Sequence, residues 1–229
     1  MKRMLPAILL AVSAVSARAQ QQVGYAPSRS PYQDVDQTME IALLTGHFSA
    51  APDPAGVAPQ GGALWSFLYG WHAAGPLFLN ASLSRTSSVR KVLDPSRSNP
   101  DVGLWDWPLW AVDGTASLSL TGDRTFHGFM PLANLGMGFI SDRHTQSDVG
   151  SYQFGTRFEF VWGFTIRWVA SNRWALRADL NNRMYSMGYP QTYYTVGKNN
   201  TTIVPATLSK SFWRNNPSLT IGISYLFSH

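Results

Sequence analysis

The 229-residue chain contains no cysteine. Without thiols it can form no disulfide scaffold, no cysteine-ligated zinc site and no cysteine nucleophile, and it can carry no lipid anchor on an N-terminal cysteine. Charge is also scarce: 14% of the residues are charged, against about 25% in an average soluble domain. Long apolar runs are missing too. After residue 19, no stretch reaches the ~18 uninterrupted apolar residues of a membrane helix, which excludes a polytopic helical membrane protein.

The first residues have the pattern of a secretory signal peptide. Lys2 and Arg3 are basic, residues 5–17 are apolar, and a small-x-small cleavage pattern ends at Ala19. We therefore predict a signal peptide over 1–19. Three basic residues leave with it, so the formal net charge of +5 falls to +2. The high isoelectric point thus gives no support for a nucleic-acid partner.

Residues 20–37 are rich in Gln, Pro and Ser and are predicted to be a flexible periplasmic leader. From there to the C-terminus, over 38–229, segments of about ten residues alternate between apolar and small or polar side chains. The clearest is 158–168. Its large apolar residues occupy every second position, which a helix cannot place on one face. They are Phe158, Phe160, Trp162, Phe164, Ile166 and Trp168.

Eight such segments predict eight antiparallel strands in an up-and-down meander. Their connections alternate between long, irregular segments and short turns, as in an outer-membrane barrel with long external loops and short periplasmic turns. The predicted strands are 39–47, 64–72, 77–85, 112–120, 132–140, 158–168, 174–185 and 218–227. The predicted long loops are 49–62, 88–111, 142–155 and 186–217.

A soluble eight-stranded barrel also alternates, but it turns its bulky apolar side chains inward. The interior of an eight-stranded barrel is just wide enough for side chains to fill. The small polar set therefore suits the lumen, and the bulky set suits lipid. The residues predicted to face lipid include Phe158, Phe160, Trp162, Phe164, Ile166, Leu176, Ile221 and Ile223. The charged residues predicted to line the lumen are Glu40, Glu159, Arg167, Arg177, Asp179 and Arg183.

Three acids and three arginines inside the barrel favour a salt-bridged plug, because buried charges must pair. A polar conduit or a catalytic pocket is the alternative. No group of residues has the spacing of a metal site, and no cofactor is expected.

The run GTRFEFVWGFTIRWVASNRWALRADLNNRMY and the closing SLTIGISYLF resemble the last hairpin and final strand of small OmpA/OmpX-type outer-membrane β-barrels. The resemblance implies a monomeric bacterial outer-membrane protein that the barrel-assembly machinery inserts. Members of this family usually end on the aromatic residue of the last strand, whereas Ser228 and His229 follow Phe227 here. Larger members carry a peptidoglycan-binding domain after the barrel, which this sequence does not include.

The predicted function is a non-enzymatic envelope-structural or surface-interaction role, with outer-membrane lipid and lipopolysaccharide as partners. A narrow channel or hydrophobic-solute conduit is one alternative. A lipid-modifying enzyme that uses His47 and Ser49 is another, although no third, orienting carboxylate can be identified. Three tryptophans within 103–110 are predicted to anchor in the lipid interface or to contact a partner. The basic loop residues proposed to bind lipopolysaccharide phosphates are Arg90, Lys91, Arg97, Arg143, Lys198, Lys210 and Arg214.

Overall fold

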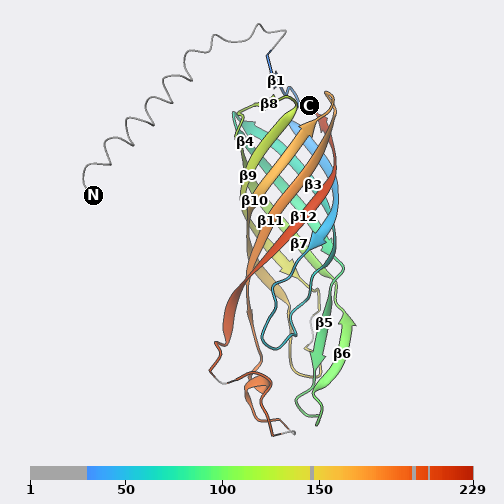
Figure 1. Cartoon of the computed structure of the whole chain (residues 1–229), viewed down its shortest axis with the longest axis vertical. Helices are drawn as coiled ribbons and strands as arrows, with labels where there is room; N and C mark the ends of the chain where they lie inside the picture. Colours follow the sequence, from blue (N-terminus) through green and yellow to red (C-terminus); the bar gives the residue numbers. More distant parts are fainter. Residues whose placement is uncertain (1–29, 145–146, 198–199, 206, 229) are drawn as a thin grey trace, which may run out of the picture.

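The computed structural model describes residues 30–144, 147–197, 200–205 and 207–228. The predicted signal peptide and the first part of the predicted leader lie outside these residues. The described chain is an elongated β-barrel with loops gathered at one end (Figure 1). None of the described residues form a helix that is long and apolar enough to cross a membrane.

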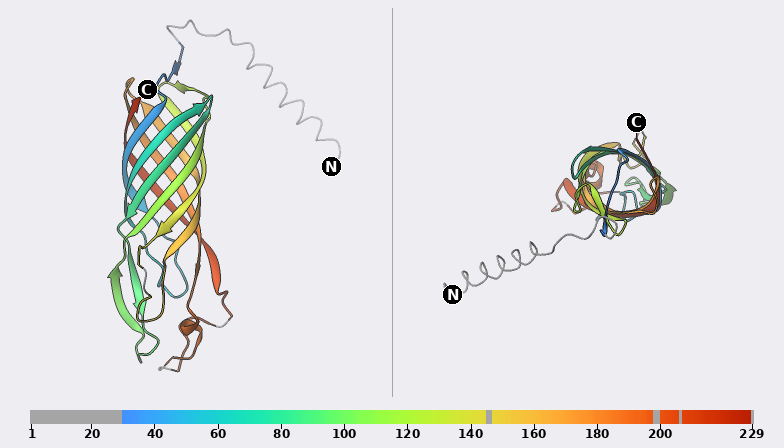
Figure 2. Two further views of the ribbon diagram at one scale, coloured as in Figure 1. Left: turned by 180° about the vertical axis from the view of Figure 1, so that it is seen from behind. Right: turned by 90° about the horizontal axis from the view of Figure 1, so that it is seen from above.

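Eight long antiparallel strands make up the barrel, which confirms the predicted fold class and strand count. Each pairs with the next in sequence, and β12 pairs with β2 to close the ring, as the view along the axis in Figure 2 shows. The barrel strands are β2 (Met39–Phe48), β3 (Gly62–Ala74), β4 (Leu77–Thr86), β7 (Leu109–Ser119), β9 (Phe129–Ser141), β10 (Thr156–Val169), β11 (Trp174–Gly188) and β12 (Ser211–Phe227).

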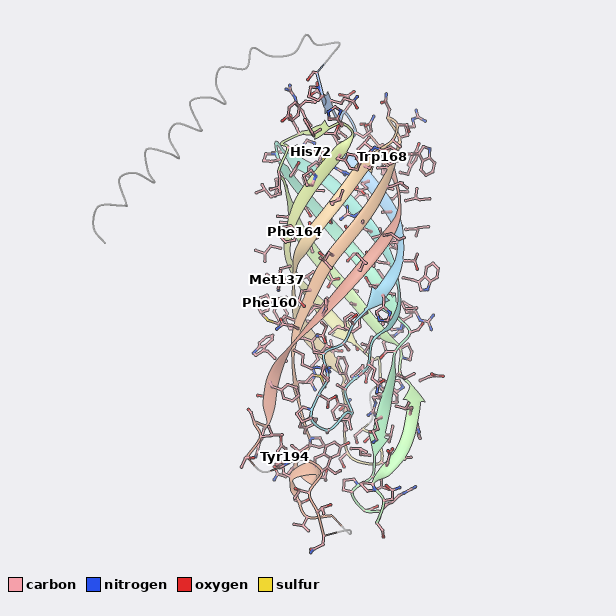
Figure 3. The ribbon with its side chains drawn as sticks, viewed as in Figure 1. His72, Met137, Phe160, Phe164, Trp168 and Tyr194 are labelled. Atoms are coloured by element: carbon pink, nitrogen blue, oxygen red, sulfur yellow. The ribbon has the colours of Figure 1, made fainter. Side chains whose placement is uncertain are left out.

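The two faces of the barrel are as the alternation predicts. Phe164 is 56% exposed on the outside, while its neighbour Thr165 is 1% exposed and points inward. Figure 3 shows Phe160, Phe164 and Met137 on the outer surface. All the residues predicted to face lipid are exposed in the same way: Phe158, Phe160, Trp162, Phe164, Ile166, Leu176, Ile221 and Ile223.

Aromatic residues gather near both ends of the outer surface. At the end that holds the C-terminus, Trp168 stacks on Phe129 with 6.2 Å between ring centroids, and Trp174 contacts Tyr225 at 5.1 Å. Toward the loop end, Phe158 contacts Phe139 at 5.8 Å. Two aromatic girdles around an apolar band are typical of a transmembrane barrel.

The end of the barrel that holds the C-terminus, here called the terminal end, differs from the prediction in one respect. The sequence predicts a flexible leader over 20–37, but Tyr32–Asp34 form a short strand, β1, that pairs with β8 (Arg124–Phe126). An ion pair of 2.7 Å between Asp34 and Arg124 joins the two strands. The backbone pairing compensates for the poor apolar content on which the prediction rested.

The loop end is more ordered than the sequence predicts. The segment 88–111 contains a hairpin of β5 (Val89–Leu93) and β6 (Asp101–Asp106). The segment 186–217 begins and ends inside strands, because β11 and β12 remain paired out to Gly188 and Ser211. The sequence does not predict this extension of β12, because Pro217 is unfavourable inside a strand. This proline is tolerated because β2 begins to pair with β12 only at Ser218, so Pro217 occupies an edge position.

Candidate functional site

One cluster of charges occupies the lumen toward the terminal end. Glu40 on β2 accepts hydrogen bonds from Arg167 Nη1 at 2.7 Å and from Arg177 Nη1 at 3.3 Å. Arg177 Nε also donates to Asp179 Oδ1 at 2.9 Å. Ser224 Oγ donates to the second oxygen of Glu40 at 2.5 Å. All four ionised groups are at most 5% exposed, so each charge is neutralised by its neighbours rather than by water.

A second cluster lies closer to the loops and depends on a residue absent from the predicted set. Arg183 donates from Nη1 to Glu159 Oε1 at 2.7 Å, and its Nη2 lies 2.6 Å from Asp113 Oδ2. This residue is Asp113, which stands on the polar, inward face of strand β7, so the same alternation is consistent with its position in the lumen. Its pairing with Arg183 could not be read from the sequence, because it depends on barrel closure. Two carboxylates here share one guanidinium group.

Neutral side chains connect the two clusters. Thr165 donates to Asp179 at 2.5 Å and accepts from Asn134 at 2.9 Å, and Ser117 donates to Asn134 at 2.7 Å. Asn80 donates to Ser117 at 2.8 Å. The cavity that remains between them measures about 30 Å³, which is room for about one water molecule. The lumen is therefore filled by side chains.

Apolar side chains close the lumen at the terminal end. Phe78, Met130 and Leu132 are buried there, and Val35 packs against them from the segment before β2. The guanidinium of Arg167 lies over the Phe78 ring, 4.8 Å from its centroid. This layer separates the charges from the solvent at that end.

The loops pack into a folded unit that closes the other end, here called the loop cap. Its core contains buried apolar and tyrosine side chains from every long loop and from the ends of the barrel strands. They are Phe48, Val57, Ala58, Leu64, Leu93, Leu109, Ala111, Ile140, Tyr152, Phe154, Tyr185, Met187, Tyr189, Tyr193 and Val204. The loops are thus parts of one core rather than separate flexible segments.

Arg90 is the central polar residue of the loop cap. Its side chain is fully buried, and it donates from Nη2 to Asp148 at 2.7 Å. The guanidinium lies 4.1 Å from the centroid of Trp107 and 5.0 Å from that of Tyr152. Trp107 in turn donates to Asp142 at 2.7 Å. These contacts join two loops, 88–111 and 142–155, through one charge.

The loop cap also contains buried phenols, and that of Tyr152 lies beside the Arg90 guanidinium. Burial raises the pKa of Tyr152 well above its ordinary value, and it does the same for Tyr189 and Tyr193. Tyr189 donates to Asp53 at 2.7 Å. Asp53 also accepts hydrogen bonds from the backbone N–H groups of Val57 and Ala58, which fixes the turn of the first loop within the loop cap. The phenols are therefore neutral over the ordinary pH range.

The residues proposed to bind lipopolysaccharide fall into different environments. For Arg90 and Arg214 the prediction is wrong: they are 0% and 4% exposed, and a buried guanidinium cannot reach a lipid phosphate. Lys91 pairs with Asp101 at 2.6 Å. Lys210 is exposed, and Lys198 lies outside the described residues.

Two further basic residues differ in their partners. Arg97 pairs with Asp94 at 3.0 Å, and a hydrogen bond from Ser96 holds the pKa of that carboxyl below its ordinary value. Arg143 is exposed and lies over the ring of Trp110, 5.5 Å from its centroid. Of the exposed members of the predicted set, Arg143 and Lys210 therefore have no carboxylate partner among the described residues.

The three tryptophans of 103–110 also lie in three different environments. Trp107 is buried beside Arg90 in the loop cap, Trp105 is exposed on β6, and Trp110 lies on the outer face of β7 at the level of the loop-end girdle. Only Trp110 has the position expected of an interface anchor. The sequence could not distinguish them, because their roles depend on how the β5–β6 hairpin folds back.

His47 and Ser49 are exposed at the loop end of β2. In the described part of the chain, neither side chain makes a hydrogen bond, and no carboxylate orients the imidazole. The described residues also contain no group of three His, Asp or Glu side chains able to hold a metal ion. The arrangement lacks the hydrogen-bonded chain that nucleophilic catalysis requires.

No family model matches this chain, and no curated protein matches its sequence. Among solved structures, the Neisserial surface protein A is similar, with 14% identity, 82% of this chain and 97% of that chain covered, and a TM-score of 0.46. The N-terminal β-barrel domain of Pseudomonas aeruginosa OprF is 12% identical, with 83% of this chain and 98% of that chain covered and a TM-score of 0.45.

A third structure, OprG from Pseudomonas aeruginosa, is 10% identical, with 84% and 98% coverage and a TM-score of 0.46. The predicted resemblance to small outer-membrane barrels is confirmed for the fold, on the closed eight-stranded meander described above.

Proposed function

We propose that this chain is a non-enzymatic, monomeric β-barrel of the bacterial outer membrane that stabilises the envelope and presents the loop cap at the cell surface. The single observation that carries the proposal is the closure of the barrel: a filled lumen lies between the terminal apolar layer and the loop cap. A barrel with a filled lumen would act through its outer surface, which contacts lipid, and through its loop cap. The partners in this proposal are outer-membrane lipid, lipopolysaccharide and, during insertion, the barrel-assembly machinery.

The first test asks where the protein resides and how it is folded. It should fractionate with outer membranes and resist detergent until heated, so that boiled and unboiled samples migrate differently on a gel. Protease added to whole cells should cut only in the loop cap. Recovery from the soluble fraction with no heat shift would contradict the proposal.

The second test addresses the channel alternative by planar-bilayer conductance. The wild-type protein should give no steps above the bare-bilayer baseline. A matched control replaces Arg167, Arg177 and Arg183 with Ala, which removes the side chains that fill the lumen. If the control shifts on heating and conducts, the assay detects an open lumen. Steps from the wild type equal to those of the control would establish the channel.

The lipid-modifying alternative is tested separately. Cells that express the wild type, His47→Ala or Ser49→Ala should have the same lipid A and phospholipid acylation profiles. A profile that changes with the wild type and reverts in either variant would show an enzyme.

A further inference from the structure

The outer surface of the barrel carries one exposed charge. Arg85 is exposed near the end of β4, and the other charged residues of the eight described barrel strands occupy inward-facing positions. The outward positions are otherwise apolar, small or uncharged. No described carboxylate lies within ion-pair distance of Arg85, so the side chain is not neutralised by the protein.

Arg85 stands in a row of aromatic residues that crosses three strands. It is in register with Trp65 on β3 and with Trp110 on β7. Its guanidinium lies over the Trp110 ring, 5.6 Å from the centroid, and that of Arg143 lies 5.5 Å from the same centroid. Arg143 comes from the segment after β9 and has a left-handed backbone, with φ of 59°. Two guanidinium groups therefore share one indole.

The position of this pair on the barrel limits what can neutralise it. A cation on the lipid face costs about 2–4 kcal/mol at the bilayer midplane and about 0–1 near an interface. Arg85 is the last residue but one of β4 on the loop side. In the orientation of the proposed function, both guanidinium groups lie among the headgroups of the outer leaflet, where phosphate oxygens suit their geometry.

An apolar groove begins at the same place. It has a volume of about 830 Å³ and runs over the outer faces of β2, β3, β4 and β12 toward the terminal end. Arg85 and Trp110 line it at the loop side, and Trp174 and Tyr225 line it at the other. Between them the groove is lined by Ile41, Leu43, Phe67, Leu83, Ile221 and Ile223. A groove of this volume and apolar lining suits acyl chains.

We infer that Arg85, Arg143 and the groove form a binding site for a single phosphorylated, multiply acylated lipid of the outer leaflet, of the lipid A type. The phosphates bind the two guanidinium groups beside Trp110, and acyl chains occupy the groove. This inference rests on the proposed function, because it requires the barrel to span the outer membrane. A second copy of the chain is a poorer occupant, since the described barrel strands offer no outward carboxylate for Arg85.

The experiment measures lipid binding by native mass spectrometry on the mature barrel in detergent. The probes are bisphosphorylated lipid A and the same glycolipid without phosphates. The wild type should bind one molecule of the first at least about tenfold more tightly, which corresponds to about 1.4 kcal/mol. Arg85→Gln and Arg143→Gln should each weaken binding of lipid A by about tenfold, as expected for loss of a charge-assisted contact, and should leave binding of the other glycolipid unchanged.

Matched variants separate this site from general loop charge. Lys210→Gln removes one exposed positive charge away from the groove and should change neither affinity. Leu43→Trp fills the groove and should weaken both lipids equally, whereas Leu135→Trp on β9 should affect neither. Arg85→Lys retains a charge and should preserve most of the preference, which tests the proposal if Arg85→Gln does not fold.

Three results would overturn the inference. They are equal affinity of the wild type for both lipids, equal losses in Lys210→Gln and Arg85→Gln, and a lipid-free dimer that Arg85→Gln dissociates. Each can occur in a barrel that still shifts on heating and does not conduct. Failure of the lipid site can therefore be distinguished from failure of the proposed function.

Discussion

Replacing Arg183 by Met is the sharpest perturbation of the lumen. The guanidinium contacts Glu159 at 2.7 Å, Asp113 at 2.6 Å and Ser84 at 3.4 Å, and both carboxyl groups are at most 3% exposed. Methionine retains much of the volume but leaves two buried carboxyl groups without a cation. Breaking a buried ion pair in this way costs about 3–5 kcal/mol, and we expect a loss of that size.

The matched variant is Glu159→Gln, which removes one of the two acids and leaves Arg183 paired with Asp113. Because two carboxyl groups share one guanidinium, this change should cost about 1 kcal/mol or less, which is the scale of a single hydrogen bond (about 0.5–1.5 kcal/mol). The assay is equilibrium unfolding in urea of barrels folded into lipid vesicles, followed by tryptophan fluorescence. The heat shift on gels reports whether each variant inserts.

The combination Arg183→Met, Glu159→Gln and Asp113→Asn removes the whole cluster and should recover most of the loss. If Arg183→Met cost no more than Glu159→Gln, the cluster of Arg183, Glu159 and Asp113 would not be an ion-pair network, and the interpretation of the lumen as a salt-bridged plug would be refuted. If the triple variant were as unstable as Arg183→Met, packing rather than charge would explain the loss.

The other predictions concern the barrel faces and the loop cap. Phe164→Arg should destabilise the barrel in a bilayer by about 2–4 kcal/mol, whereas Thr165→Val should cost about 1–3 kcal/mol by removing a buried hydrogen bond; a gain from Thr165→Val would contradict its inward position. Arg90→Met should increase the rate of proteolysis in the cap while the heat shift is unchanged, and equal proteolysis would refute the central role of Arg90. The pKa of Tyr152 and Tyr193 is raised by burial, so the cap should be fully stable below a pH of about 10, the ordinary tyrosine value, and lose stability above it; phenolate absorbance that rises with no increase in proteolysis would contradict this.

The barrel was predictable because its signals are local. Alternation along Phe158–Trp168 can be recognised without knowledge of the rest of the chain. A two-residue period then assigns each side chain to a face, because the bulky apolar face of a membrane barrel contacts lipid. The same rule placed Glu40, Arg177 and Asp179 in the lumen. It could not choose their partners, because Glu40 on β2 meets Arg167 on β10, and these strands are not neighbours.

The loop cap was not predictable for the opposite reason. Arg90 and Arg214 look like solvated loop charges in the sequence, since both lie in segments that are predicted to be long, irregular loops. Arg90 is buried because Asp148, 58 residues later, approaches it within the loop cap. Arg85 was overlooked although alternation places it on the lipid face, because a single charge at a strand end is ordinary in a barrel. The role inferred for Arg85 depends on Trp110 and Arg143, and the folded barrel is needed to bring these two residues beside it.

The charges inside a lumen that is filled by side chains require an explanation. Replacing a buried ion pair by apolar residues is often neutral or stabilising, so stability alone does not account for them. The positions of these ion pairs suggest that they select the register in which the barrel strands pair. A slip of one residue would turn Glu40 and Arg177 toward lipid while exposing apolar residues to the lumen, at a cost that an all-apolar lumen would not impose. Because Glu40 also bonds to Arg167 across the barrel, the same network favours one closure of β12 on β2. We therefore expect the lumen charges to favour the observed strand register over a register shifted by one residue.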